Sequence, residues 1–236
     1  MPDLAIALFG RAPSAPDAKT RLRRGLAGSP GATLPACLLR DTAAVVTRVA
    51  GADTVVVCTP DDAGAEFREL VPAARHIVPQ RGDELGRRMH QAFVDLFSLG
   101  YQRVMVIGTD LPTLPAAHLE MAADALAVAG RTRVVLGPAE DGGYYLIGLT
   151  GPAPGVFEGV AWSTPHVFAQ TVAAAARAGL EVSTVPPWFD VDTRDDLARL
   201  AMDLQSLPRD VAPFTREWLR AASPIPRPAS GPRSRR

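Results

Sequence analysis

The chain has 236 residues, of which 47% are hydrophobic and 21% are charged, a composition typical of one globular α/β domain. Its 25 basic and 25 acidic residues cancel, which excludes a general electrostatic attraction to nucleic acid or to an anionic membrane. The N-terminal run "LAIALF" lacks a preceding basic stretch and is too short for a signal-peptide core or a membrane span. We therefore expect a cytoplasmic protein with no nucleic-acid partner and no membrane span.

Apolar runs predict the strands of a buried sheet. Several runs are continuous rather than alternating, which is typical of strands covered on both faces. The predicted strands, in chain order, are 4–9, 54–59, 103–108, 133–137, 144–149 and 181–186. The two cysteines, Cys37 and Cys58, fit neither a metal site nor a disulfide framework and are expected to be buried, reduced thiols.

Helical patterns lie between most of these strands. Apolar residues recur on one stripe in each of the first two predicted helices. The stripe of 34–50 consists of Leu34, Leu38, Val45 and Val49, and that of 83–99 consists of Leu85, Met89, Phe93 and Leu96.

Capping signals mark two further helices. Ser163 and Thr164 are candidate N-caps for a helix over 165–178, and Gly179 supplies its C-terminal stop. The last clear helix opens with "TRDD", where Thr193 and Asp196 resemble a capping box with a shorter acid.

The alternation of strands and helices predicts a mainly parallel sheet between helices. One exception is "VVLGPAEDGGYYLIGL", where two strands flank a Gly-Gly turn that forms either a hairpin or an irregular crossing. We expect one domain over 1–222, followed by a disordered tail over 223–236 that is rich in proline, serine and arginine.

The segment "RVMVIGTDLPTLP" places Asp110 just beyond the end of a buried strand. Ligands of open parallel sheets bind at this edge, and burying an unpaired carboxylate is expensive. Asp110 is therefore a candidate metal ligand or catalytic base. The alternative is a structural role, in which Asp110 caps a helix begun near 111–115.

A second acidic cluster, "FDVDTRDDL", follows the last strand. Asp195 and Asp196 are explained by the start of a helix, where acids suit the helix dipole. Asp190 and Asp192 are not, and in an extended chain both would point to one side. Mg²⁺ needs only one or two carboxylates and fills its other positions with water and phosphate oxygens. One acid from each strand end would meet that requirement.

The loop "GRAPSAPDAKTRL" follows the first strand and contains Arg11, Lys19 and Arg21. Such a loop can hold phosphates through charge-assisted hydrogen bonds and a helix N-terminus, although a solvated basic surface is also consistent with it. It has no Gly-x-x-x-x-Gly-Lys-Ser/Thr pattern, and Gly-x-Gly-x-x-Gly is also missing, so a dinucleotide-dependent oxidoreductase loses its main support.

The segment "AEDGGYYLIG" places two acids beside two glycines. Gly142 and Gly143 permit positive φ or close approach by a ligand, with Glu140 and Asp141 at the edge of a cleft. A plain hairpin turn explains the same residues.

Together these motifs make the chain resemble a bacterial GT-A-fold transferase family of largely unassigned function, which includes glycosyltransferases of arsenosugar biosynthesis. The resemblance runs from residue 4 to about 200, and it is carried in order by "KTRL", "PQRGDELGRRM", "IGTDLPTL", "GPAEDGGYYLIGL", "WSTP" and "DVDTRDDL". A more distant similarity reaches nucleotidyltransferases such as phospholactate guanylyltransferase. The fold implied is a Rossmann-like GT-A domain, a mainly parallel sheet flanked by helices.

The resemblance also implies roles for individual residues. Asp110 and Asp192 match the acids that hold Mg²⁺ or Mn²⁺, while Gln80 and Gly86 match positions near the base. The residues expected at the phosphates are Arg11, Lys19 and Arg21, and those expected at the sugar or acceptor are Glu140, Asp141, Gly142, Gly143, Trp162 and Ser163. The chain departs from the family's Pro-x-Pro-Gly turn at Ala15 and Pro16, and Pro16 has no N–H for a phosphate.

The function expected is that of a metal-dependent transferase with a nucleotide-activated donor, foremost a nucleotide sugar, and a small-molecule acceptor. Asp110, Glu140 and Asp141 are its candidate catalytic residues. The first alternative is a nucleotidyltransferase that joins an NTP to a sugar phosphate or phospho-acid and releases pyrophosphate. The second is a nucleotide-binding protein without catalysis.

Overall fold

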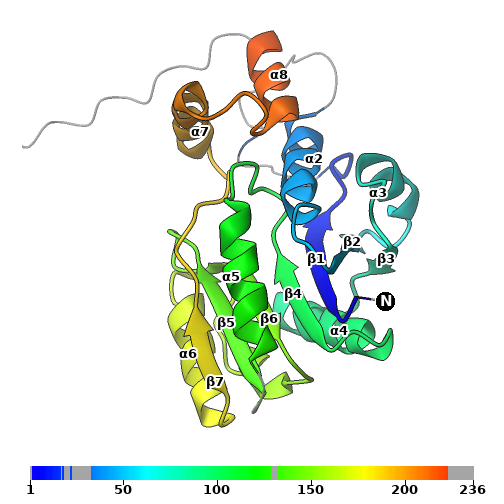
Figure 1. The fold of residues 1–236 in the computed structure, drawn as a ribbon, viewed down its shortest axis with the longest axis vertical. Helices are drawn as coiled ribbons and strands as arrows, with labels where there is room; N and C mark the ends of the chain where they lie inside the picture. The colour runs from blue at the N-terminus through cyan, green and yellow to red at the C-terminus, as the bar shows by residue number, and fades with distance from the viewer. Residues whose placement is uncertain (1, 17, 19–21, 23–32, 129–131, 223–236) are drawn as a thin grey trace, which may run out of the picture.

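The computed structural model describes residues 2–16, 18, 22, 33–128 and 132–222 (Figure 1). The predictions for Lys19, Arg21 and the tail over 223–236 lie outside these residues. None of the described helices combines the length and the apolar content that crossing a membrane requires.

A seven-stranded sheet forms the centre of the molecule, in the order β3-β2-β1-β4-β6-β5-β7. β6 is antiparallel to both of its neighbours, and the other adjacent strands are parallel. The predicted α/β class with a mainly parallel sheet is therefore confirmed. The strands are β1 (Leu4–Arg11), β2 (Ala52–Thr59), β3 (His76–Pro79), β4 (Arg103–Ile107), β5 (Arg133–Pro138), β6 (Tyr144–Leu149) and β7 (Glu181–Thr184).

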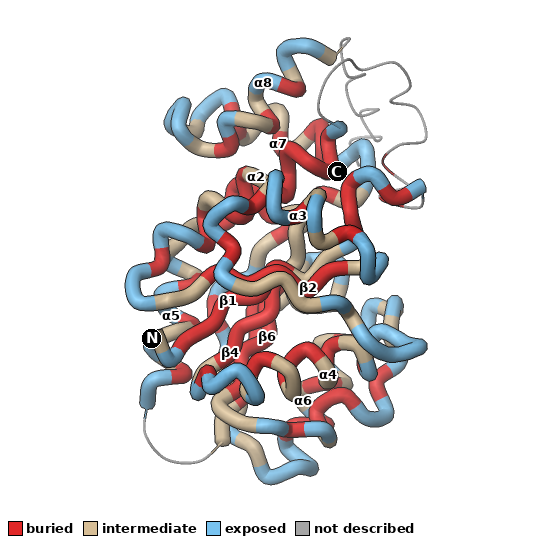
Figure 2. Tube along the Cα trace, turned by 90° about the vertical axis from the view of Figure 1, so that its right-hand side faces the viewer, coloured by how far each residue is buried: buried red, intermediate tan, exposed pale blue. Residues whose placement is uncertain are grey.

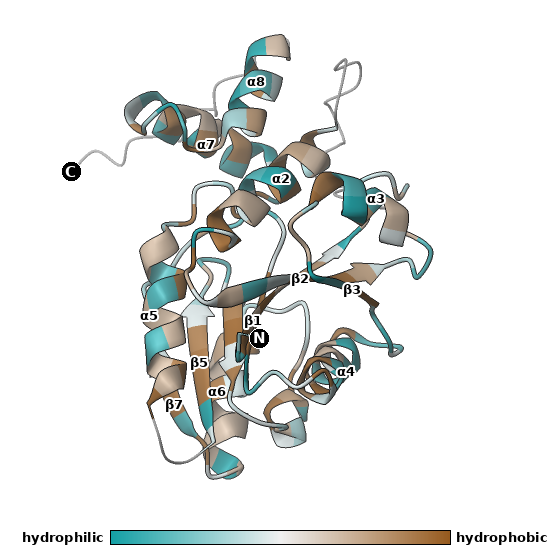
Figure 3. Cartoon of the chain, turned by 45° about the vertical axis from the view of Figure 1, so that its right-hand side comes forward, coloured by the Kyte–Doolittle hydropathy of each residue, from teal (hydrophilic) through white to brown (hydrophobic). Residues whose placement is uncertain are grey.

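Helices cover both faces of the sheet, because the strands present apolar side chains on both sides (Figure 3). In β1, Leu4, Ile6 and Leu8 face one layer, and Ala5 and Ala7 face the other. The first layer contains α2 (Leu34–Val46), α3 (Gly64–Leu70) and α5 (Ala116–Ala127), and the second contains α4 (Leu85–Ser98), the 3₁₀ helix η1 (Pro154–Phe157) and α6 (Val167–Arg177).

A third, smaller core lies beyond the carboxyl ends of β1 and β4, where α8 (Pro213–Ala221) packs on α2 and α7 (Arg194–Ser206) packs on α8 (Figure 1). The burial colours of Figure 2 continue from the sheet into this region. The residues of the third core include Leu34, Leu38, Val191, Leu197, Leu200 and Trp218.

Most of the predicted elements are present, with some corrections. The capping box of Thr193 and Asp196 and the stop at Gly179, whose φ is +72°, are confirmed. The N-cap prediction for Ser163 and Thr164 is wrong, because α6 begins at Val167, while Thr164 turns its hydroxyl onto the Ala161 carbonyl 2.7 Å away. Elements β3, α3, α5 and α8 were not predicted.

Two side-chain predictions have different outcomes. Cys37 and Cys58 are free and buried, as expected. Leu85 was predicted on the buried stripe of its helix, but it stands in the first turn of α4 with 40% of its surface exposed. The region between β5 and β6 is the hairpin alternative, closed by a hydrogen bond from the Ala139 N–H to the Gly143 carbonyl.

Candidate active site

The chain reverses its direction of winding between β1 and β4, which are neighbours in the sheet. The crossover from β1 leads to β2 on one side, while β4 lies on the other, so the loops after the two strands diverge. Gly10 allows these loops to start close together, because a Cβ there would lie 2.4 Å from Thr109 Cγ2. The opening at this switch point is the place where the fold can take a ligand.

Two cavities meet at this edge. The larger, about 640 Å³, is lined by residues that include Asp141, Trp162 and Asp192. The smaller, about 220 Å³, is lined by residues that include Arg11 and Asp110. Phe9 and Gly108 line both, so the cavities adjoin across the ends of β1 and β4.

A buried threonine, Thr42, holds the turn that carries Asp110 through a hydrogen bond. Thr42, on α2, has no exposed surface, and its Oγ1 accepts a hydrogen bond of 2.9 Å from the Leu111 N–H. The same hydroxyl lies 2.9 Å from the Leu38 carbonyl and 3.2 Å from that of Thr109. The alternative that Asp110 caps a helix is wrong, because α5 begins at Ala116 and its N-cap is Pro115.

A backbone hydrogen bond holds the segment that carries Asp192 next to the turn that carries Asp110. The Val191 N–H donates to the Asp110 carbonyl at 3.1 Å, and the Asp192 N–H donates to Asp196 Oδ2 at 3.2 Å. Both carboxylates belong to half-buried residues at the cavities. Within the described ranges, no three or more His, Cys, Asp or Glu side chains form a metal-binding group. Two carboxylates fit Mg²⁺ or Mn²⁺ when phosphate oxygens and water supply the other ligands.

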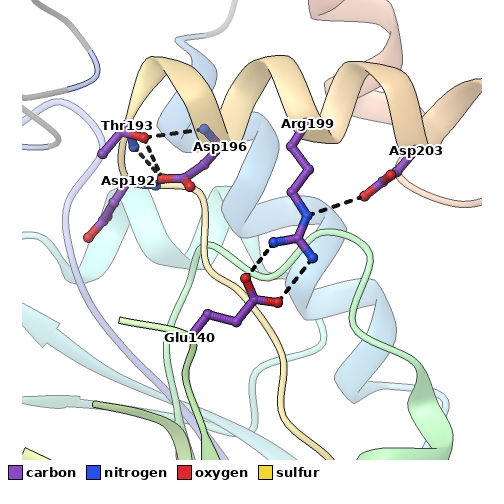
Figure 4. Close-up of polar contacts among 6 residues, drawn as sticks. All are labelled: Glu140, Asp192, Thr193, Asp196, Arg199 and Asp203. Carbon is purple, nitrogen blue, oxygen red and sulfur yellow. Dashed lines mark hydrogen bonds and ion pairs between the residues drawn. The ribbon is translucent and has the colours of Figure 1, made fainter. Parts of the chain in front are cut away.

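The neighbouring acids Glu140 and Asp141 have different surroundings. Glu140 makes a two-pronged ion pair with Arg199 of α7, at 2.6 and 3.0 Å, and Arg199 also lies 3.9 Å from Asp203 (Figure 4). These hydrogen bonds hold the pKa of Glu140 below its usual value. Asp141 instead lines the larger cavity, and its Oδ1 accepts a hydrogen bond from the Gly143 N–H at 2.9 Å.

The two glycines of the turn differ in what requires them. Gly142 has a φ of +90°, and a Cβ there would lie 2.2 Å from the Pro165 carbonyl oxygen. Its own carbonyl accepts a hydrogen bond from the Phe168 N–H at 3.0 Å, so the turn is docked on the start of α6. Gly143 lines the larger cavity. The close packing on Pro165 therefore explains the glycine at position 142, while Gly143 forms part of the cavity wall.

Trp162 and Ser163 line the same cavity. Trp162 lies directly on Gly86, where a Cβ would be 2.5 Å from the indole Nε1. Gly86, predicted near the base, therefore seats this indole. Ser163 has a φ of +63°, an uncommon conformation for a residue with a side chain.

Gln80 ties the first strands together. Its Nε2 donates to the carbonyls of Gly10 and Val57, both at 3.1 Å, and its backbone N–H donates to that of Cys58. These bonds leave the Oε1 atom as the part of the side-chain amide that could meet a base.

Several residues that line the larger cavity were not among the predicted site residues. Tyr145 is one of them: its ring covers Gly137, and its hydroxyl is 2.9 Å from the Pro186 carbonyl and 3.1 Å from His118 Nδ1. Burial lowers the pKa of His118. The apolar wall residues Phe9, Leu85, Met89, Tyr144 and Val167 also line the cavity. Their only sequence signal is apolar character, which core residues share.

Comparison with solved structures identifies the fold. A protein of Desulfovibrio desulfuricans G20, assigned provisionally to the nucleotide-diphospho-sugar transferases, is 31% identical with a TM-score of 0.81, over 94% of this chain and 97% of that one. The predicted transferase class and GT-A fold agree with this relative.

Two other solved structures share the fold at low identity. CMP:2-keto-3-deoxy-manno-octonic acid synthetase complexed with CTP is 14% identical with a TM-score of 0.57, over 86% of this chain and 99% of that one. Glucosyl-3-phosphoglycerate synthase of Mycobacterium tuberculosis, complexed with Mn²⁺, UDP and glucosyl-3-phosphoglycerate, is 10% identical with a TM-score of 0.50, over 88% of this chain and 81% of that one.

A search of curated proteins found no match. The model of the family described as "Uncharacterized protein conserved in bacteria (DUF2064)" matches residues 42–164. That range is more than half of the chain, and the 31% identical relative extends the likeness over nearly all of it. The chain belongs to the DUF2064 family.

Proposed function

We propose that the protein is a glycosyltransferase that moves a sugar from a nucleotide-diphospho-sugar to the hydroxyl of a small-molecule acceptor, with Mg²⁺ or Mn²⁺. One observation carries the proposal: the cavity with Arg11 and Asp110 adjoins the cavity with Asp141 and Asp192, since Phe9 and Gly108 line both. A diphosphate in the first would present its sugar to an acceptor in the second.

On the donor side, Arg11 offers a guanidinium for phosphate oxygens, which it can bind in a two-pronged manner. Asp110 and Asp192 would hold the divalent cation together with the diphosphate. When bound, the cation offsets the negative charge that develops on the leaving group. Since two carboxylates leave most metal positions open, metal binding should depend on the nucleotide.

On the acceptor side, Asp141 is the better placed base. It lines the cavity, whereas Glu140 is held by Arg199 and its pKa is lowered, which makes it a weaker base. The acceptor oxygen forms a bond to the anomeric carbon of the sugar, and the bond from that carbon to the diphosphate oxygen breaks. The proton of the acceptor hydroxyl goes to Asp141, and the nucleoside diphosphate leaves with the electron pair.

The nucleotidyltransferase alternative uses the same fold, as the likeness to a CTP-bound synthetase illustrates. It differs in products: an NTP would react and pyrophosphate would leave. Product analysis separates the two, because the glycosyltransferase releases a nucleoside diphosphate from a nucleotide sugar and leaves an NTP unchanged.

The test is a thermal-shift screen of UDP, GDP, ADP, CDP and dTDP sugars and the matching NTPs, with and without Mn²⁺. A ligand at a hundred times its Kd stabilises by about 2.7 kcal/mol, which corresponds to roughly 5–11 °C at this size. We expect one nucleotide sugar to give a shift that requires the metal, and Asp110→Asn to abolish it.

Asp210→Asn is the matched control, because Asp210 is exposed and lies away from both cavities, 3.9 Å from Arg48. It should leave the shift intact. A shift that needs no metal, or one that survives in Asp110→Asn, would contradict the proposed site. A shift with NTPs alone would favour the nucleotidyltransferase.

A further inference from the structure

Part of the lining of the larger cavity is apolar. Trp162 packs against Gly86, and Leu85, the residue before Gly86 in α4, keeps 40% of its surface exposed. Met89 also lines the cavity, with its sulfur 3.6 Å from the Tyr144 hydroxyl. An indole and an exposed leucine in one cavity offer apolar surface that an apolar ring face would cover favourably.

Other residues of the lining are polar. Asp141, Asp192, Ser163 and Thr164 are among them, and none of the lining residues that the structure describes is Lys, Arg or His. Asp141 Oδ1 is bound to the Gly143 N–H, while Oδ2 makes no hydrogen bond within the described part of the chain. This oxygen can accept a proton or a hydrogen bond from a ligand hydroxyl.

This lining selects among acceptors by charge. A phosphate or carboxylate in the cavity would meet the Asp141 carboxylate and would find no cation among the described lining residues, and like charges repel. A cation bound by Asp192 would balance that acid and leave a single carboxylate, Asp141, toward the acceptor. A hydroxyl satisfies a single carboxylate without introducing any charge.

We propose that the acceptor is a hydroxyl-bearing compound that has an apolar ring face and no negative charge, which packs on Trp162 and Leu85 and presents its hydroxyl to Asp141. This inference rests on the proposed function, since it names the acceptor class of the same reaction. It separates this protein from enzymes whose acceptor carries a phosphate.

The experiment measures binding by isothermal titration in the presence of saturating nucleoside diphosphate and Mg²⁺. The probes are phenyl β-D-glucopyranoside, its 6-phosphate and methyl β-D-glucopyranoside. We expect the neutral phenyl glycoside to bind at least about tenfold more tightly than each of the other two, which corresponds to about 1.4 kcal/mol. Trp162→Ala should remove the advantage of phenyl over methyl, and Trp162→Phe should keep most of it.

A charge variant separates repulsion from simple lack of fit. Asp141→Asn should raise the affinity for the 6-phosphate relative to the neutral phenyl glycoside, because one repelling carboxylate is gone. The inference is overturned if the phosphate binds as tightly as the neutral glycoside, if no neutral glycoside binds, or if Trp162→Ala changes nothing.

The outcome is also distinct from that of the proposed function. The nucleotide-dependent thermal shift of the unaltered protein reports on the donor site, whose smaller cavity Trp162 does not line. Glycoside binding without any nucleotide shift would refute the donor site and leave the cavity inference standing. A nucleotide-dependent shift together with tighter binding of the 6-phosphate would support the donor site and refute the inference about the acceptor.

Discussion

Thr42 connects the core to the candidate site, and its removal gives a prediction that the structure makes quantitative. Thr42→Val replaces a buried hydroxyl by a methyl group of similar size. The Leu111 N–H, whose residue is also fully buried, then loses the acceptor 2.9 Å away and has no water to replace it. Leaving a buried donor unsatisfied costs about 1–3 kcal/mol.

The size of the effect follows from what each group contributes. The Leu38 carbonyl loses only a second hydrogen bond, because the Thr42 hydroxyl bonds to it in addition to the backbone of α2. For a chain of this length, a loss of 1–3 kcal/mol lowers the Tm by roughly 2–12 °C. The turn that carries Asp110 loses its anchor, so the metal-dependent nucleotide shift should shrink as well.

Urea unfolding of Thr42→Val, Thr42→Ser and Thr42→Ala isolates the hydroxyl. Threonine to valine replaces the hydroxyl by a methyl group, and serine to alanine removes the hydroxyl. Threonine to serine removes one methyl group and keeps the hydroxyl. The two hydroxyl steps should each cost about 1–3 kcal/mol, and only variants with the hydroxyl should keep full nucleotide binding. Hydroxyl steps below about 0.5 kcal/mol, with binding unchanged, would refute the reasoning.

Two further predictions concern the backbone and pH. Gly142→Ala should lower the free energy of unfolding, measured in urea, more than Gly159→Ala does. Both glycines have a positive φ, but only a Cβ at position 142 would clash with the Pro165 carbonyl. Equal losses of free energy in the two variants would contradict this reasoning. Burial raises the pKa of Asp41 above 3.8, so the folded protein keeps a proton that the unfolded chain releases. Stability should therefore fall as pH rises from the pKa of the unfolded chain through the raised pKa of the folded protein, and Asp41→Asn should flatten that slope.

The fold was largely predictable because its signals are local. The continuous apolar runs of β1, β2 and β4 mark strands covered on both faces, and the Thr193 box marks a helix start within four residues. The start of α8 is different: the Asp41 carboxylate, 173 and 174 residues away, accepts the N–H groups of Phe214 and Thr215. No short window of sequence contains that cap.

The site was predictable in its members more than in their orientations. Asp141, Trp162 and Asp192 were expected near the acceptor or the metal, and the structure brings them to one cavity. Glu140 and Asp141 are adjacent in the sequence, yet one meets Arg199, 59 residues away, and the other lines the cavity. Their difference depends on where α7 packs, which residue types and spacing do not express.

The third core joins these observations. Asp196 Oδ2, at the start of α7, accepts the N–H of Asp192, and the Val191 N–H binds the Asp110 carbonyl. The other side of the Asp110 turn is held by Thr42 of α2, the helix that shares the third core with α7 and α8.

The two carboxylates are therefore positioned by helices that share one small core, and neither belongs to a regular strand or helix itself. A loop held only at its ends would let the acids move apart, which a cation with few protein ligands could not oppose. The third core, which α7 shares with α2, supplies that missing constraint on the two loops that carry the proposed metal ligands.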